Sequence, residues 1–220
     1  MRTSLIRRAE SPVGNWICDL VRKQFVTILG RPVDFCLINA GSFRGDKIYE
    51  DPFTVESLLS LLPFNDLTLG YLVSGARIRM AIEAGISKYP AEHGGFPCIS
   101  GMKARLKGRK VISLHLLDNS DVKDDKEYVM VTKSFLAEDG KDGFECLKGY
   151  CKPLMDKDLA ILLSSLVRSA LSAANAVLLM QPRKDVSLRF IEKLRNHGKK
   201  KDAFHVLVHS EIDHRLIIEE

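Results

Sequence analysis

A short run of small and polar residues, Asn39–Arg44, follows directly after a fully apolar segment, Val33–Ile38. A buried strand that ends in a turn of small residues exposes backbone N–H groups and lets a ligand approach closely. Arg44, at the end of the turn, could donate two hydrogen bonds to the oxygens of a phosphate or carboxylate. The same spacing also suits a structural turn with a surface arginine, so the motif alone leaves both interpretations open.

Two further segments place an aromatic residue beside polar ones. Leu62–Asp66 is a proline-fixed turn that presents Phe64, and such a turn more often serves packing than binding. Ser134–Phe144 is an acidic, glycine-rich loop in which Phe135 could stack on a base and Asp142 could accept a hydrogen bond from a ribose hydroxyl. Stacking of a base on an aromatic side chain is worth about 1–3 kcal/mol. Each of these signals alone is weak.

The six histidines lack the spacing of a metal site. They form no HxH or HExxH pattern, although His205 and His209 share a face of a strand-like segment. A dinuclear phosphoesterase centre needs several Asp, His and Asn ligands, and no stretch contains DxH, GDxxD, GNH or GHxH. The chain also lacks GxSxG, the turn that carries the catalytic serine of α/β-hydrolases. We therefore predict neither a metal site nor a catalytic residue in this chain.

The composition is that of an ordinary globular protein. Of 220 residues, 33 are basic and 28 acidic, which gives a net charge of +5, and 45% are hydrophobic. A small positive excess favours anionic ligands such as phosphates, but a nucleic-acid-binding protein concentrates its basic residues more strongly. The basic residues are spread out, apart from Arg2, Arg7 and Arg8 and the run Lys199–Lys201, which we interpret as a solvated loop. We expect no nucleic-acid partner.

The cysteines and the apolar stretches indicate in which cellular compartment the protein is expected. The five cysteines, an odd number without a CxxC pair, are typical of a reduced, intracellular chain, so we expect a cytoplasmic protein. The first residues contain no apolar stretch long enough for a signal peptide. The longest apolar stretch, residues 159–180, is interrupted by serines, an arginine and an asparagine. It therefore predicts a buried helix and no membrane span.

Hydrophobic periodicity indicates a mixed set of elements. Helical spacing predicts helices at residues 15–29, 54–62, 76–88, 156–180 and 187–196, with Thr54 as an N-cap. Alternating or fully apolar runs predict strands at 33–38, 67–73, 102–106, 110–117, 127–132, 203–208 and 215–218, and Gly and Pro predict a loop at 90–100. The order is not a regular strand–helix alternation. It favours one α+β layered domain over 1–220, a mixed sheet packed by helices, with a helical addition at 151–200 and closing strands at 203–218.

Six short motifs occur in the order of a known family. The chain resembles the 5'-nucleotidase C-terminal domain at residues 8–19 (R-A-E-S-P-V-G-N-W-I-C-D), 39–44 (N-A-G-S-F-R), 61–64 (L-L-P-F), 72–75 (L-V-S-G), 94–101 (G-G-F-P-C-I-S-G) and 135–144 (F-L-A-E-D-G-K-D-G-F). The resemblance covers about residues 7–150, with a closing strand near Arg215. Several motifs in the correct order are much more specific than any one of them.

The resemblance implies a nucleoside or nucleotide pocket in this domain. By motif position, Phe64 and Phe135 sandwich the base. Asn39 and Arg44 contact the substrate, and Asp142 holds the ribose. In the family, a separate N-terminal metallophosphoesterase domain holds two divalent metal ions and the catalytic histidine. That domain is absent from these residues and is the expected partner, in one longer chain or as a separate protein. The chain alone is therefore predicted to be inactive.

The motifs depart from the family pattern at three places. Ala40 and Phe43 stand where the family prefers glycine and a branched aliphatic residue, so we expect a methyl group where the backbone should approach the ligand. Residues 65–66 are Asn-Asp in place of the usual Gly-Asn, and the last loop is one residue longer than its common form. The Asn-Asp pair at 65–66, the Lys-Asp-Gly segment at 141–143 and the run Asp-Lys-Ile-Tyr at 46–49 resemble eukaryotic microbial members of the family more than bacterial periplasmic ones.

We therefore predict the substrate-binding half of a 5'-nucleotidase-like, metal-dependent phosphohydrolase. The alternative is a non-catalytic nucleotide-sensing or protein-interaction module, in which the helix at 156–180 would be a docking surface. A structural remnant without a ligand is a third interpretation. A metallophosphoesterase domain encoded upstream of Met1 would favour the first, and a natural start at Met1 without such a gene partner would favour the second.

Overall fold

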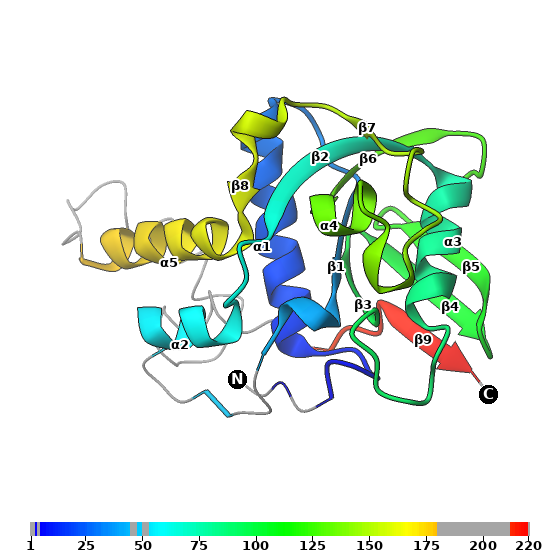
Figure 1. The fold of residues 1–220 in the computed structure, drawn as a ribbon, viewed down its shortest axis with the longest axis horizontal. Helices are drawn as coiled ribbons and strands as arrows, with labels where there is room; N and C mark the ends of the chain where they lie inside the picture. Colours follow the sequence, from blue (N-terminus) through cyan, green and yellow to red (C-terminus); the bar gives the residue numbers. More distant parts are fainter. Residues whose placement is uncertain (1–2, 4, 45–47, 50–52, 180–211, 220) are drawn as a thin grey trace.

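The computed structural model describes residues 3, 5–44, 48–49, 53–179 and 212–219 and has an α+β architecture with two sheets (Figure 1). The larger sheet has six strands in the order β3-β1-β6-β2-β7, and β8 also pairs with β2. Strands β1 and β6 are parallel, and the other pairs in this sheet are antiparallel. Its members are β1 (Phe35–Asn39), β2 (Leu67–Ser74), β3 (Pro97–Ser100), β6 (Glu127–Lys133), β7 (Lys152–Pro153) and β8 (Ile161–Leu162). The predicted fold class is confirmed.

The smaller sheet has three strands in the order β5-β4-β9. Strands β4 (Met102–Lys107) and β5 (Lys110–Leu116) form an antiparallel hairpin, and β9 (Leu216–Glu219) pairs with β4 in parallel. Buried and exposed residues alternate along β4, which is the pattern of a strand with one face on the core. The strands predicted at 102–106, 110–117 and 215–218 are therefore confirmed.

Helix α1 (Pro12–Leu29) packs against β1 and β3 of the larger sheet. Pro12 occupies the first turn, where its missing N–H has no intrahelical partner to lose, and Gly30 ends the helix in the left-handed conformation with φ of 61°. The apolar residues at helical spacing are buried, namely Trp16, Ile17, Val21 and Phe25. The helix predicted at 15–29 is confirmed and begins three residues earlier.

The remaining helices lie on two sides of the molecule. Helix α3 (Gly75–Gly85) packs against β2 and β5. Helices α2 (Val55–Leu61) and α5 (Leu163–Leu179) lie beside each other, on the opposite side of α1 from α3 (Figure 1). Thr54 caps α2 as predicted, because its Oγ1 accepts a hydrogen bond from the Ser57 N–H at 3.1 Å. Shorter turns are α4 (Ser134–Ala137) and the 3-10 segments Ala40–Ser42, Lys141–Gly143 and Lys157–Leu159. None of the described helices is both long and apolar enough to cross a membrane.

The helix predicted at 156–180 begins only at Leu163. The apolar residues before it form β8, which pairs with Leu67 and Thr68, and β7 pairs with β2 further along. The edge of β2 offers backbone hydrogen bonds to this segment. The spacing of apolar residues within the segment cannot reveal a pairing partner that is so distant in the sequence. The interpretation of residues 151–162 as part of a helical addition is therefore wrong. The helix predicted at 187–196 and the strand at 203–208, with His205, lie outside the described residues.

The predicted loop at 90–100 contains a strand. Strand β3 pairs antiparallel with β1, with Pro97 opposite Asn39 and Ser100 opposite Cys36. Glycine and proline in this stretch indicate a loop, but the pairing with β1 supplies backbone hydrogen bonds that composition does not reveal. As a consequence, the residues just before Pro97 are held beside the end of β1.

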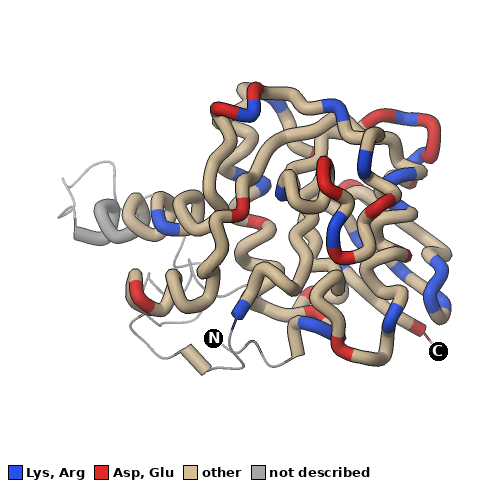
Figure 2. Tube along the Cα trace, in the orientation of Figure 1, with Lys and Arg blue, Asp and Glu red and all other residues tan. Residues whose placement is uncertain are grey.

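Charged residues of both signs are spread through the described part of the chain. In the trace of Figure 2, basic and acidic positions are intermixed, and neither sign is gathered in one part of it. Most ion pairs between described residues have at least one largely exposed side chain, such as Lys152 with Glu127 and Lys110 with Glu83. This agrees with the spread of basic residues in the sequence and with the absence of a concentrated basic stripe in the described part.

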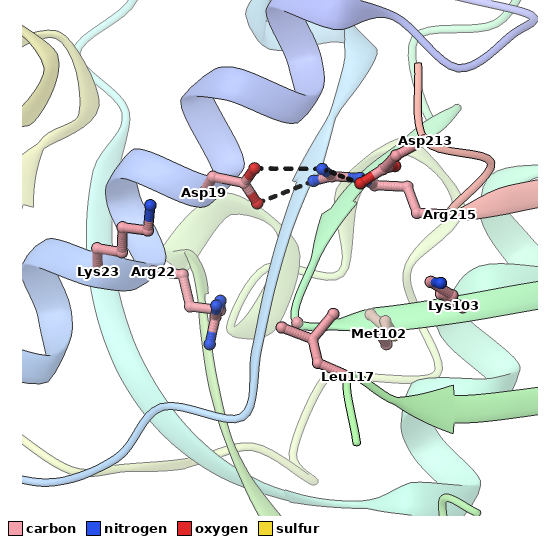
Figure 3. Close-up of a pocket in the computed structure, with 9 residues that line it drawn as sticks. Asp19, Arg22, Lys23, Met102, Lys103, Leu117, Asp213 and Arg215 are labelled. Atoms are coloured by element: carbon pink, nitrogen blue, oxygen red, sulfur yellow. Dashed lines mark hydrogen bonds and ion pairs between the residues drawn. The ribbon is translucent and has the colours of Figure 1, made fainter. Parts of the chain in front are cut away.

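Arg215 joins the C-terminal strand to the first helix. Its guanidinium bonds to Asp19 of α1 at 2.9 Å and to Asp213 at 2.8 Å (Figure 3). It also donates to the Ile99 carbonyl at 3.0 Å. These carboxylates raise the pKa of Arg215, although burial opposes them. A pocket of about 210 Å³ lies beside this cluster, between α1 and β4. The guanidinium is occupied by protein partners, so we assign it to holding β9 in place.

Candidate functional site

A pocket of about 340 Å³ forms at one end of the larger sheet. We call it the strand-end pocket. It is lined by Arg7, Asn39, Gly41, Arg44, Phe64, Asp66, Gly94, Lys133, Phe135 and Asp142. The lining includes all five site residues that were predicted from the sequence, namely Asn39, Arg44, Phe64, Phe135 and Asp142.

The strand directions explain this convergence. Because β1 and β6 are parallel, their carboxyl ends lie at the same end of the sheet, and Asn39 and Lys133 are their last residues. Strand β2 runs antiparallel to β6 and β3 runs antiparallel to β1, so the starts of β2 and β3 lie there too. Phe64, Asp66 and Gly94 stand just before those starts. Phe135 follows β6 in α4, and Asp142 is in the next turn.

Asn39 and Asp142 form the polar part of the pocket. The Asn39 amide Nδ2 donates to Asp142 Oδ2 at 2.6 Å and to the Gly94 carbonyl at 3.1 Å, and its Oδ1 accepts from the Ser42 hydroxyl at 3.0 Å. Asn39 is only 1% exposed. Its amide is thus satisfied within the protein, and its geometry suits the positioning of Asp142. A direct contact of Asn39 with substrate stays a prediction.

The Asp142 carboxylate is brought close to the backbone of the turn after β1. A Cβ atom at Gly41 would lie 2.9 Å from Asp142 Oδ2 and 2.8 Å from Asn39 Nδ2, so a side chain at position 41 would force the hydrogen-bonded Asn39 and Asp142 to move. Asp142 itself has a φ of 56°, in the left-handed region. In the described part of the chain, Asn39 is the only residue that donates a hydrogen bond to this carboxylate. Oδ1 therefore remains available as an acceptor.

Each aromatic side chain of the pocket has a cation at its ring. Arg44 Cζ lies 4.8 Å from the centre of the Phe64 ring, and Lys133 Nζ lies 4.9 Å from that of Phe135. Phe64 is 37% exposed, so it is not a core residue, whereas Phe135 is partly buried against the core. The arrangement offers aromatic and cationic surface to a planar, anionic ligand.

Comparison with known proteins defines the family. The family model for the 5'-nucleotidase C-terminal domain matches residues 2–149, more than half of the chain. The chain belongs to this family. It is a nucleotidase-associated substrate-binding domain, as the order of its motifs predicts.

Relatives of this domain are longer proteins. A 5'-nucleotidase of Diplobatis ommata is 29% identical over 164 residues, which cover 66% of this chain and 28% of that protein. A snake venom 5'-nucleotidase of Macrovipera lebetinus is 28% identical over 169 residues, which cover 67% of this chain and 40% of that protein. The chain thus spans less than half the length of these relatives.

Solved structures share the fold. The 5'-nucleotidase precursor of Thermus thermophilus has a TM-score of 0.70 at 19% identity, covering 99% of this chain and 37% of its own. The NAD nucleotidase of Haemophilus influenzae has a TM-score of 0.54 at 19% identity, covering 74% of this chain and 30% of its own. These matches support the α+β fold of the 5'-nucleotidase C-terminal domain for this chain.

Two departures from the family motif do not reach the pocket. Ala40 is fully buried and Phe43 is 2% exposed, and both belong to the hydrophobic core. The expectation that the Ala40 methyl group would stand where the ligand approaches is therefore wrong. The turn keeps its shape through backbone bonds from Ala40 to Phe96 at 2.8 Å, from Gly41 to Gly94 at 2.6 Å and from Arg44 to Leu61 at 2.9 Å.

The sequence did not nominate Lys133, Asp66 and Arg7 as pocket residues. Lys133 Nζ lies 2.8 Å from Asp66 Oδ2, and the two side chains are only 2% and 15% exposed. Burial lowers the pKa of Lys133, while the Asp66 carboxylate opposes this shift. The sequence feature that could have indicated a pocket residue here is a lysine at the end of a strand whose preceding residues are apolar and buried. Arg7 reaches the pocket from the N-terminal segment, where its carbonyl accepts a hydrogen bond from His93 N at 3.1 Å.

The described residues offer no place for the two metal ions that the family implies. No group of three or more His, Cys, Asp or Glu side chains able to hold a metal ion occurs among them. The acidic residues of the strand-end pocket, Asp66 and Asp142, are instead paired with Lys133 and Asn39. The donor set of this pocket does not fit a dinuclear centre, and we derive no metal-dependent step from these residues.

Proposed function

We propose that this chain binds a nucleoside or nucleotide in the strand-end pocket and presents it to a metal-dependent phosphohydrolase domain. The observation that carries the proposal is that two aromatic rings, an arginine and an oriented carboxylate, from separate segments of the chain, line one pocket. Pockets that bind small molecules commonly combine apolar surface with a few placed polar groups.

Five of the residues that line the pocket have a role in this proposal that their chemistry supports. Phe64 and Phe135 hold the base by stacking. Asp142 Oδ1 accepts a hydrogen bond from a ribose hydroxyl, while Asn39 holds Oδ2 at 2.6 Å. Arg44 is exposed and lies over Phe64, where its guanidinium can bond to phosphate oxygens.

The hydrolytic step belongs to another domain in this proposal. That domain, a metallophosphoesterase in one longer chain or a separate protein, would supply two divalent ions and the attacking hydroxide. This chain would contribute affinity and orientation, which lower the barrier by placing the phosphate before the reaction. We also propose a cytoplasmic location, which the five unpaired cysteines favour.

Calorimetric titration with AMP tests the binding proposal. We expect saturable binding to the wild-type chain, and about tenfold to hundredfold weaker binding to Asp142→Gly, because a hydrogen bond to a charged group is worth about 1.5–3 kcal/mol. Glycine adopts the left-handed conformation of position 142 without strain. Loss of the acceptor of Asn39 should still lower the free energy of unfolding by about 1–3 kcal/mol, part of which the relief of strain at position 142 offsets.

Asn119→Gly is the matched control for this titration. Asn119 also has a positive φ, of 64°, and it lies in the turn that follows β5, outside the lining of the strand-end pocket. Its affinity for AMP should equal that of wild type. If neither AMP nor another nucleotide binds to the wild-type chain, the proposed function is wrong.

Phosphate release tests where hydrolysis resides. The purified chain, incubated with AMP and Mn²⁺, should release no phosphate above the blank, because the described residues lack a metal-binding cluster. Turnover that disappears on substitution of a local His or Asp would show that the chain carries its own catalytic centre, and would contradict this assignment.

A further inference from the structure

The buried pair of Lys133 and Asp66 is the feature of the strand-end pocket that the proposed roles leave unused. We infer that this pair contacts the hydrogen-bonding edge of the base and selects a 6-oxopurine, guanine above all, over adenine. The inference rests on the proposed function, because it requires a base between Phe64 and Phe135.

The pair stands next to the two aromatic residues. Asp66 is two residues after Phe64, and Lys133 is two residues before Phe135. Lys133 is opposite Thr68 in the β2–β6 register, so the two segments leave the sheet side by side. Its Nζ lies 2.8 Å from Asp66 Oδ2 and 4.9 Å from the centre of the Phe135 ring. The charged pair therefore lies beside the Phe135 ring, within reach of a base that binds in this pocket.

Both members keep hydrogen-bonding capacity for a ligand. The Lys133 ammonium has three N–H bonds, and among the described residues only Asp66 accepts a hydrogen bond from it. No described residue donates a hydrogen bond to Asp66 Oδ1, while the Asp66 carbonyl is fixed by the Leu163 N–H at 2.9 Å. The pocket wall thus presents an anionic acceptor beside a cationic donor, in a place where water is largely excluded.

The 6-oxopurine edge complements this pair. Guanine carries a carbonyl oxygen beside an N–H and an adjacent amino group, so the oxygen can accept from Lys133 while two N–H bonds point to Asp66. Hypoxanthine offers the same oxygen and one N–H. Adenine has a lone pair on the ring nitrogen that bears hydrogen in guanine, and this lone pair would face the carboxylate. Hydrogen bonds to charged groups in a low-dielectric site are strong, and a mismatched edge leaves them unmade.

Calorimetry with guanosine, inosine and adenosine, measured on the 220-residue chain, tests this inference. We expect guanosine to bind about tenfold or more tightly than adenosine, with inosine between them, because one bidentate contact to a base discriminates by about this factor. Asp66→Asn should reduce the preference to about threefold or less, since one acceptor oxygen is replaced by an amide donor. Asp139→Asn, an exposed acidic residue outside the pocket lining, should keep the preference.

A second variant protects the test against misfolding. Asp66→Asn leaves Lys133 buried without a counter-ion, so the double variant Asp66→Asn/Lys133→Met is measured beside it. It should still bind nucleosides but without preference. Equal affinities in the wild type, or a guanosine preference that survives in the double variant, would overturn the inference and leave the proposed function intact. Absence of any nucleoside binding in the wild type would instead refute the proposed function itself.

Discussion

Replacement of Phe135 by alanine should weaken nucleoside binding roughly 5- to 150-fold, which corresponds to the loss of about 1–3 kcal/mol of base stacking. Phe135 lines the strand-end pocket and is only partly covered by the core, so one part of its ring is available to a ligand. Alanine removes the aromatic surface and leaves the base with Phe64 alone.

Phe135 also packs against the core, so a change in folding must be separated from a change in binding. Phe135→Leu retains apolar volume without a π face and should lose most of the affinity with a smaller loss of stability. Tyr150→Ala is the control, because Tyr150 is an exposed aromatic that stacks on Arg77 and is not part of the pocket lining. Saturation-transfer NMR with adenosine measures all three variants. Unchanged signals for Phe135→Ala would refute the base sandwich.

Replacement of Arg215 by alanine should lower the free energy of unfolding by about 2–3 kcal/mol, because it removes the packing of a buried side chain together with its hydrogen bonds to two carboxylates and a buried carbonyl. The Arg215 side chain is 9% exposed and bonds to Asp19, Asp213 and the Ile99 carbonyl. These contacts tie β9 to α1 and β3. Urea unfolding monitored by circular dichroism gives the difference between wild type and variant.

Arg105→Ala is the matched control for Arg215→Ala. Arg105 also pairs with a residue of β9, Glu219, but the two side chains are 57% and 40% exposed. Exposed ion pairs contribute about 0–1 kcal/mol, so Arg105→Ala should change stability by less than about 1 kcal/mol. If the two variants lose the same free energy of unfolding, the contacts of Arg215 contribute no more to holding β9 than an exposed ion pair does.

Local patterns were enough to predict the elements that carry their own signals. The buried face of α1, the Thr54 cap and the β4–β5 hairpin follow from spacing, capping chemistry and alternation within short windows. The convergence of Asn39, Arg44, Phe64, Phe135 and Asp142 in one pocket was predicted differently, from the order of motifs across the chain.

Contacts between distant segments were not predictable in this way. Strands β3, β7 and β8 form because β1 and β2 offer unpaired backbone groups, and their own residues suggest a loop or a helix. The Lys133–Asp66 pair depends on the register of β2 with β6, which no local pattern specifies. The burial of Ala40 depends likewise on the direction in which the turn leaves β1.

A crystal structure of the chain with a nucleoside monophosphate would test most directly whether the strand-end pocket is a nucleotide site. We expect the base between Phe64 and Phe135, a ribose hydroxyl within hydrogen-bonding distance of Asp142 Oδ1, and the phosphate near Arg44. Density for the nucleotide in another place, such as the pocket beside Asp19 and Arg215, with the strand-end pocket empty, would contradict the proposed function.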